Sequence, residues 1–225
     1  MITKLKNEWQ IQLICFLLAI FYLWGMSLVP FHPDESTQIY MSQDPFDFIR
    51  DPLSLSYTPQ TDLTGKMTYR AIDMPLTRYL IGLARFVVNE PGLSSDWNWS
   101  LSWESNLNSG AYPSPALLNT ARFIPTLLIP ISIYLFYFSA RKILPKVPAL
   151  FAVLFLGLNP LVLLHCRRAM AESVLLFGIA LLLWAITRDQ IKPILIGIAL
   201  AVAFNAKQTG IFLLPAGIIA VCTLP

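Results

Sequence analysis

The chain has 225 residues, of which 56% are hydrophobic and 13% charged, with a mean hydropathy of +0.60 and a net charge of +3. A chain this apolar is not an ordinary soluble domain, and so small a net charge does not indicate nucleic acid as a partner. We therefore expect an all-α, multi-pass integral protein of the cell (inner or plasma) membrane, surrounded by the lipid bilayer.

About six transmembrane helices are predicted, near residues 9–29, 116–140, 148–164, 169–186, 193–206 and 209–224. The first stretch is long enough to span a bilayer and lacks the small-residue cleavage site of a signal peptide, so we expect it to remain. Three of the others, 148–164, 193–206 and 209–224, are at or below the usual length of a straight span. We expect these to be tilted, short or partly re-entrant.

The positions of the cations predict the topology. If the six spans hold, one side of the membrane carries Lys4, Lys6, Arg141, Lys142, Lys146, Arg188 and Lys192. Cytoplasmic loops are enriched in lysine and arginine, so this side is predicted to be cytoplasmic, together with the N-terminus. The long segment 30–115 is then an outer loop.

The outer loop 30–115 is too long for a turn and is expected to contain interfacial helices. Residues 74–88 place apolar side chains on one helical face and arginines elsewhere, which is typical of a helix lying in the membrane interface. A second helix is predicted to start at Asp34 and to reach Met41. The stretch 93–115 is expected to be irregular, with its tryptophans at headgroup level.

Two acids, Asp34 and Glu35, follow directly after the first apolar stretch in the sequence His32-Pro33-Asp34-Glu35. Such acids are ordinary at the N-terminus of a helix, where they cap it. A carboxylate at the rim of a cavity of low dielectric is also suited to act as a base. Neighbouring residues on a helix point about 100° apart, so only one of the two is expected to face a cavity fully. We regard Asp34 as the better candidate.

Ionisable residues also lie at the predicted outer ends of the spans, namely Arg122, Arg167, Arg168, Glu172 and Lys207. Such groups cost about 2.5 to 3.5 kcal/mol each at the centre of a membrane helix, so they usually face a polar cavity. A group of cations on the outer side is what binding of an anionic headgroup would need, and phosphate is the natural anion.

Each of these residues also has a structural interpretation. Arg122 would snorkel from the start of its span, and Glu172 would pair with Arg168 at i+4 on one helix. At least one of Arg167 and Arg168 would be solvated in a turn, whereas Lys207 has no such explanation.

No metal site is predicted. His32 and His165 lack a metal-ligand spacing, and the three cysteines lie in or beside apolar segments without a Cys-x-x-Cys pattern. No cofactor is indicated, and a requirement for a divalent cation stays open.

The motifs in this order resemble those of the polyprenyl-phosphate-sugar-dependent glycosyltransferases of the GT-C fold, in particular the protein O-mannosyltransferase and aminoarabinose transferase group. The motifs are His32-Pro33-Asp34-Glu35, Met74-Pro75-Leu76-Thr77-Arg78-Tyr79-Leu80, Asn119-Thr120-Ala121-Arg122-Phe123, Arg168-Ala169-Met170-Ala171-Glu172 and Lys207. Two of them depart from the family, because Met74-Pro75 replaces a double proline and Glu172 stands where Asp is more frequent. Family members usually have more spans, so the chain corresponds to the N-terminal half. Three alternatives stay open: a natural short member, a truncated gene product, and one part of a split enzyme whose fold a partner chain would complete.

The resemblance implies transfer of a sugar from a polyprenyl-phosphate donor to a glycan, lipid or protein acceptor on the outer face. It makes Asp34 the base that activates the acceptor, or an acid that orients it, with Glu35 in support. Arg122, Lys207 and Arg168 would hold the donor phosphate, and Glu172, Arg167 and His32 would support the site. Two other readings stay open, a non-catalytic polyprenyl-lipid-binding subunit and half of a transporter.

Overall fold

The computed structural model describes residues 8–58 and 65–223, and within these ranges every regular element is a helix. The loop region after the first helix holds α3 to α7, and a bundle holds the rest. The helices are α2 (Trp9–Gly25), α3 (Pro33–Met41), α4 (Asp44–Arg50), the 3-10 helix η1 (Pro52–Leu55), α5 (Lys66–Ile72), α6 (Leu76–Val88), α7 (Trp103–Asn108), α8 (Pro115–Ala140), α9 (Lys146–Gly157), α10 (Pro160–His165), α11 (Ala171–Ile186), α12 (Pro193–Ala206), the 3-10 helix η2 (Gln208–Leu213) and α13 (Leu214–Thr223).

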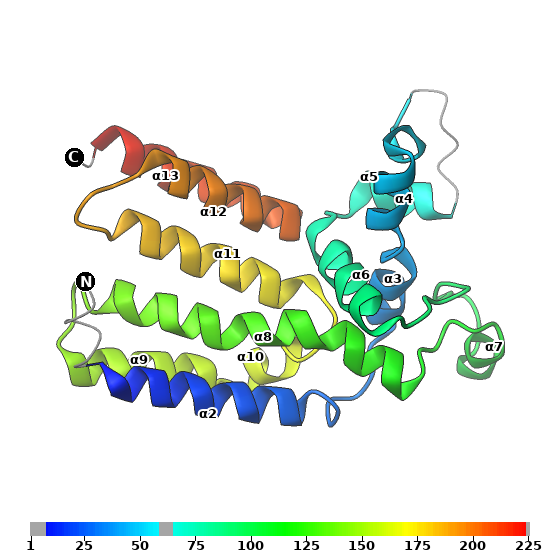
Figure 1. Cartoon of the computed structure of the whole chain (residues 1–225), viewed down its shortest axis with the longest axis horizontal. Helices are drawn as coiled ribbons and strands as arrows, with labels where there is room; N and C mark the ends of the chain where they lie inside the picture. The colour runs from blue at the N-terminus through cyan, green and yellow to red at the C-terminus, as the bar shows by residue number, and fades with distance from the viewer. Residues whose placement is uncertain (1–7, 59–64, 224–225) are drawn as a thin grey trace.

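The helices form a bundle with the loop region gathered at one end (Figure 1). In the bundle, α8 packs against α2, α9 and α11, and α11 packs against α12. The loop region is held to the bundle chiefly by α6, which packs against α8 and also touches α11 and α12. We call the end of the bundle that meets the loop region the loop end; α2 and α12 finish there, and α8 and α11 begin there (Figure 1).

The outward surface of the bundle is apolar, as expected for a membrane protein. Large apolar side chains are exposed on several helices, among them Phe16 and Trp24 on α2, Phe155 on α9 and Phe212 on η2. A soluble protein seldom exposes so much contiguous apolar surface. Within the described ranges α8 is the helix that is long and apolar enough to cross a membrane alone, and the other bundle helices are shorter. The count of six spans therefore stays a prediction.

The predicted span 148–164 is two helices in the structure, α9 and α10. The break lies at Asn159-Pro160, where the Asn159 side chain accepts hydrogen bonds from the backbone N–H groups of Leu161 and Val162. The Tyr22 hydroxyl donates to the Gly157 carbonyl at 2.8 Å, which satisfies a carbonyl at the end of α9. Asparagine followed by proline therefore starts a new helix here instead of continuing the span.

The helix α6 is amphipathic, as predicted, but its polar face is the buried one. Arg78 and Arg85 are 4% and 5% exposed, whereas Leu83 and Val87 are 53% and 75% exposed. Arg85 donates to the Ser42 hydroxyl at 2.6 Å, which ties α6 to the end of α3. An outward apolar face and an inward polar face suit a helix that rests on a membrane surface.

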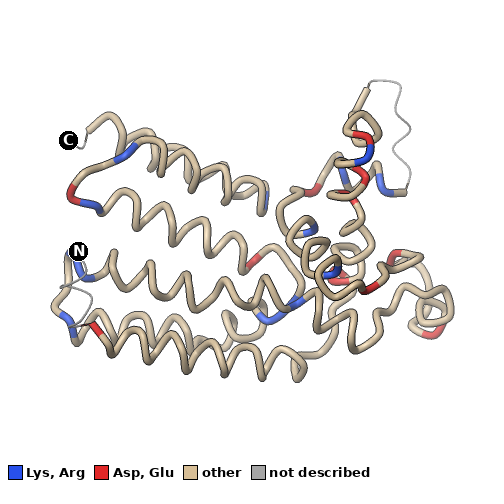
Figure 2. Tube along the Cα trace, viewed as in Figure 1, with Lys and Arg blue, Asp and Glu red and all other residues tan. Residues whose placement is uncertain are grey.

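Charged side chains occupy the two ends of the molecule and are sparse along the middle of the bundle (Figure 2). At the end opposite the loop region, Glu8 lies 3.8 Å from Arg141 and 3.7 Å from Lys146, and Lys142 pairs with Asp189. At the loop end lie Arg122, Arg167, Arg168, Glu172 and Lys207, which are the residues that the sequence singled out. This separation agrees with a bundle whose middle lies in hydrocarbon.

Candidate functional site

A fully buried ion pair joins α3 to α8. The carboxylate of Glu35 is 0% exposed and Arg122 is 1% exposed. Arg122 donates from Nε to Oε1 and from Nη2 to Oε2 of Glu35, both at 2.7 Å. Such a two-pronged pair fixes the relative orientation of both side chains.

The rest of the Arg122 guanidinium is also occupied. Its Nη1 donates to the carbonyls of Met26 and Val29 at 2.6 and 2.9 Å, and its Nη2 donates to Pro30 at 3.4 Å. Because arginine has five N–H donors, these bonds leave none for a ligand. The geometry therefore favours neither of the two roles expected for Arg122 from the sequence, which were snorkelling and contact with the donor phosphate. Arg122 instead holds the turn that follows α2.

Glu35 connects the acidic motif to the turn before α11. Its Oε1 accepts a hydrogen bond from the backbone N–H of Ala169 at 2.8 Å, and its Oε2 accepts one from the backbone N–H of His32 at 3.0 Å. Asp34 precedes Glu35 and Arg168 precedes Ala169 in the chain. The same carboxylate thus brings Asp34 and Arg168, which are far apart in sequence, to one part of the loop end.

The Asp34 side chain is 52% exposed, in contrast to its buried neighbour. His32 caps α3, since its Nδ1 accepts a hydrogen bond from the Asp34 backbone N–H at 3.2 Å. The Asp34 carboxylate lies 3.6 Å from the same nitrogen. An accepting Nδ1 leaves the proton of neutral imidazole on Nε2. Asp34 therefore faces solvent with a histidine beside it.

Arg168 is a buried cation for which the structure shows no anionic partner. It is 9% exposed, and its Nε is buried without a hydrogen-bond acceptor. In the described part of the chain no carboxylate pairs with it; the expected i+4 pair with Glu172 does not form, because α11 begins only at Ala171. A desolvated guanidinium that lacks a partner is a candidate anion site.

Arg167 next to it has a structural role. Its Nη2 donates to the Phe21 carbonyl at 2.8 Å, and its guanidinium lies over the rings of Phe21 and Tyr22. It also lies against Gly25, where a β-carbon would stand 2.4 Å from Cζ of Arg167. Arg167 therefore packs the turn before α11 against the end of α2.

Lys207 and Glu172 form an ion pair between the end of α12 and the start of α11. Nζ of Lys207 lies 2.9 Å from Oε1 of Glu172, and the lysine side chain is 44% exposed. Oε2 of Glu172 is buried without a hydrogen-bond partner. An ammonium group has three donors, so Lys207 can contact an incoming anion while it keeps this pair.

These contacts continue into the loop region. The Gln208 side chain donates to the Ile72 carbonyl, and Asp73 accepts a hydrogen bond from Gln38 at 2.6 Å. Gln38 lies on α3, one turn after Asp34. Glu35 thus contacts the turn at Ala169, and Glu172, three residues later, pairs with Lys207. From Gln208, next to Lys207, the contacts lead through Ile72 and Asp73 back to Gln38 on α3. The predicted site residues accordingly lie around one region at the loop end.

Sequence reasoning missed Gln38, Asp73, Asp96 and Tyr69. Gln38 follows Asp34 at i+4, which was a signal that it shares the face of Asp34. Thr37 donates to Asp96 at 2.9 Å, and burial together with the nearby Asp96 carboxylate raises the pKa of Tyr69 to about 12. Asp96 and Tyr69 come from the irregular part of the loop and from a short helix, so no sequence period placed them there.

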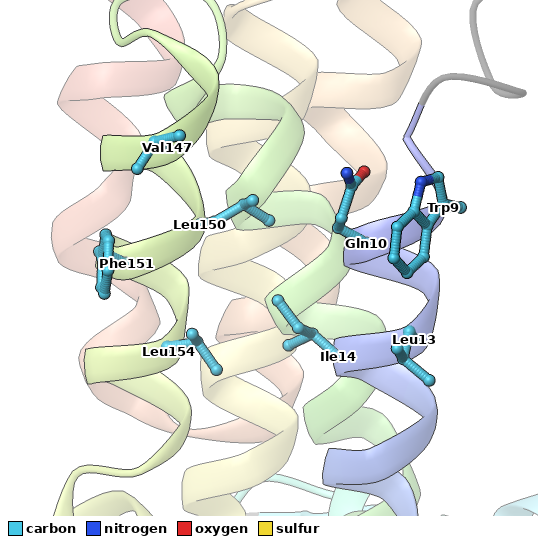
Figure 3. A pocket seen from close by; sticks show the side chains of 8 residues that line it. All are labelled: Trp9, Gln10, Leu13, Ile14, Val147, Leu150, Phe151 and Leu154. Atoms are coloured by element: carbon cyan, nitrogen blue, oxygen red, sulfur yellow. The ribbon is translucent and has the colours of Figure 1, made fainter.

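Two open apolar hollows lie elsewhere in the structure. An apolar cavity of about 330 Å³ runs between α2 and α9, lined by residues such as Leu13, Ile14 and Leu154 (Figure 3), and a second one adjoins it. Neither touches the charged residues of the loop end. In the described ranges no cluster of three or more His, Cys, Asp or Glu side chains is arranged to hold a metal ion.

Residues 117–224 match the family model of dolichyl-phosphate-mannose-protein mannosyltransferases. No curated protein and no solved structure matches the chain. The matched stretch contains Arg122, Arg168, Glu172 and Lys207, whereas Asp34 and Glu35 lie before it. The resemblance to membrane glycosyltransferases of the GT-C type that the sequence motifs indicated is therefore confirmed, over residues 117–224.

Proposed function

We propose that the chain carries the site of a membrane glycosyltransferase that moves a sugar from a polyprenyl-phosphate donor to an acceptor on the extracytoplasmic face. The observation that carries this proposal is that the Glu35 carboxylate joins the start of α3 to the turn before α11 through hydrogen bonds. It brings an exposed carboxylate, Asp34, to the same region as a buried cation without a partner, Arg168. A base and an anion site in one place are the two requirements of the reaction.

The proposed reaction divides the work between these groups. Asp34 accepts the proton of the acceptor hydroxyl as the acceptor oxygen bonds to the anomeric carbon of the sugar. The bond from that carbon to the phosphate oxygen breaks, and the electron pair leaves with the polyprenyl phosphate. Arg168 and Lys207 stabilise the negative charge that develops on the leaving phosphate. Glu35 and Arg122 fix the position of Asp34 relative to Arg168 and take no part in proton transfer.

Burial distinguishes the two acids. Both oxygens of Glu35 accept hydrogen bonds inside the protein, so the group has no room for a substrate proton. Asp34 is exposed and borders the solvent side of α3. The base proposed here is therefore Asp34, with His32 beside it as the cap of α3.

The test measures consumption of a radiolabelled polyprenyl-phosphate sugar by membranes that contain the chain. Asp34→Asn should abolish consumption, because the amide cannot accept the proton. Asp51→Asn is the matched control, since Asp51 is an exposed acid that caps a short helix and asparagine caps as well.

Either of two results would contradict the proposal. Consumption by Asp34→Asn at the wild-type rate would remove Asp34 from the chemistry. No consumption by wild-type chain that is inserted in the membrane would favour the non-catalytic lipid-binding subunit.

A further inference from the structure

Four aromatic side chains of the loop region, Phe31, Trp97, Trp103 and Tyr112, contact one another in one cluster. Together with Trp99, whose ring contacts that of His32 next to Phe31, we call them the aromatic platform. Phe31 is its centre, with ring centroids 5.7 Å from Trp97, 6.2 Å from Trp103 and 4.8 Å from Tyr112. Trp97 and Trp103 are 4.8 Å apart. The tilted and edge-to-face contacts hold these four rings against one another, so this part of the platform is pre-organised.

The outer rings of the platform are open. Trp99 is 69% exposed and Trp103 52% exposed. Trp97 is 8% exposed and packs against Trp103, whereas Trp99 packs against His32. Exposed indole rings that pack against neighbouring rings lose little side-chain entropy on binding. Such a surface in a natural protein usually marks a binding site.

The helix that begins at Trp103 lies away from the bundle. α7, which begins at Trp103, stands at the far end of the long axis of the molecule, beyond α6 (Figure 1). The face of α6 that is suited to the membrane interface lies nearer to the bundle. The expectation that the tryptophans lie at headgroup level stays a prediction.

The charge of this segment is unlike that of a membrane anchor. Residues 89–115 contain no lysine or arginine and three acids, Glu90, Asp96 and Glu104, among many serines and asparagines. Anionic headgroups and phosphates would find no cation here. Aromatic faces surrounded by hydroxyls, amides and acids suit an uncharged ligand that has apolar C–H faces and many hydroxyl groups.

The platform adjoins the proposed base. Phe31 and His32 directly precede the Pro33-Asp34 pair, and the ring of His32 lies 6.5 Å from that of Trp99 in an edge-to-face contact. A ligand seated on Trp99 would therefore place its hydroxyl groups near His32 and Asp34. A pyranose ring has the required chemistry, because its C–H face stacks on the electron-rich face of an indole.

We propose that the aromatic platform binds a neutral pyranose unit of a glycan acceptor, an inference that rests on the proposed function. The acceptor is then a carbohydrate, whose sugar ring stacks on Trp99 and whose hydroxyl reaches Asp34. This assigns a substrate class to the acceptor side of the site.

The test uses the whole chain in lipid nanodiscs and saturation-transfer NMR with methyl glucoside, mannoside and galactoside and their disaccharides. We expect transfer to the C–H protons of at least one sugar. Trp99→Ala should weaken that binding about 5- to 150-fold, the range of one lost aromatic stacking contact, and Trp99→Phe should restore part of it. The matched control is Trp24→Ala, because Trp24 is 66% exposed but lies on α2 in the bundle.

Three results would overturn the inference. The first is that no sugar of the panel receives saturation transfer from the protein. The second is sugar binding that Trp99→Ala leaves intact. The third is quenching of Trp99 by bromine-labelled lipids to the extent seen for Trp24, which would place the ring in the bilayer.

The inference and the proposed function fail separately. Asp34→Asn should lose sugar transfer yet keep sugar binding. If the wild type binds the sugars but does not transfer a sugar from the donor, the proposed function alone is contradicted. If it transfers a sugar but binds none of the panel, the platform alone is contradicted.

Discussion

Asp34 and Glu35 are adjacent acids with opposite surroundings. The helix turns by about 100° between them, so one side chain enters the protein and the other leaves it. Glu35 meets a guanidinium and two backbone N–H groups, and Asp34 meets solvent. Two consecutive positions thus provide one buried carboxylate that holds the fold together and one that is exposed to solvent.

We predict that Glu35→Gln destabilises the protein by about 3–5 kcal/mol, because it leaves the buried charge of Arg122 without its partner. Asp34→Asn should change stability by no more than about 0.5 kcal/mol, as is usual for an exposed position. Thermal unfolding of the purified protein in detergent measures both. Equal effects of the two substitutions would show that the ion pair does not stabilise the fold.

The sequence predicted where to look at the residue scale but not what each residue does. Snorkelling and ligand contact were both open for Arg122, and its actual partner, Glu35, lies 87 residues away in the chain. The partners of Arg122 follow from tertiary packing, which no local pattern reports. Lys207 and Glu172, likewise, pair across 35 residues.

The turn before α11 separates two adjacent arginines. Arg167 donates a hydrogen bond to the Phe21 carbonyl on α2, whereas Arg168 is buried and its Nε has no hydrogen-bond acceptor. At the level of sequence the two were equivalent, since which one faces the site depends on where α11 begins.

We therefore predict that Arg168→Met and Lys207→Met each weaken binding of a polyprenyl phosphate about tenfold or more, because each removes a charged hydrogen bond to phosphate. Arg167→Met should leave this affinity unchanged and lower stability instead. Titration of the lipid into the detergent-solubilised protein measures the affinity. Weaker binding in Arg167→Met than in Arg168→Met would reverse the assignment.

The helix α6 shows that an amphipathic pattern predicts a helix but not which of its faces packs against the protein. Its period predicted a helix over 74–88, and the structure has one at Leu76–Val88. The arginines lie on the protein side, because Asp44 and Ser42 supply partners there for Arg78 and Arg85.

Gly82 permits the close approach of α6 to the end of α3. A β-carbon at Gly82 would lie 2.5 Å from the Ser42 carbonyl oxygen, and backbone cannot move aside easily. We predict that Gly82→Ala destabilises by about 1–3 kcal/mol. Gly197→Ala on α12, where a β-carbon meets nothing within 4 Å, should stabilise by about 0.5–1 kcal/mol. Unfolding midpoints of the two variants that shift in the same direction would contradict this account.

At the scale of the whole molecule, composition and apolar runs predicted a helical bundle with a long loop after the first helix. The break at Asn159 was missed, because the apolar run continues across it and hydropathy does not detect a capping residue. The shapes within the loop region were the least predictable, since short helices there depend on contacts between distant segments.

Orientation in the membrane is the property on which the proposed reaction depends, because Asp34 and Lys207 must face the side where the donor sugar is presented. Lysines and arginines of the opposite end, including Arg141 and Lys142, predict that this end is cytoplasmic. In a variant without Cys15, Cys166 and Cys222, Leu53→Cys and Ile143→Cys provide exposed thiols at the loop end and at the opposite end. We expect a membrane-impermeant maleimide to label Leu53→Cys on intact cells and Ile143→Cys only after permeabilisation. The reverse pattern would place the site in the cytoplasm, where a donor presented on the extracytoplasmic face could not reach it.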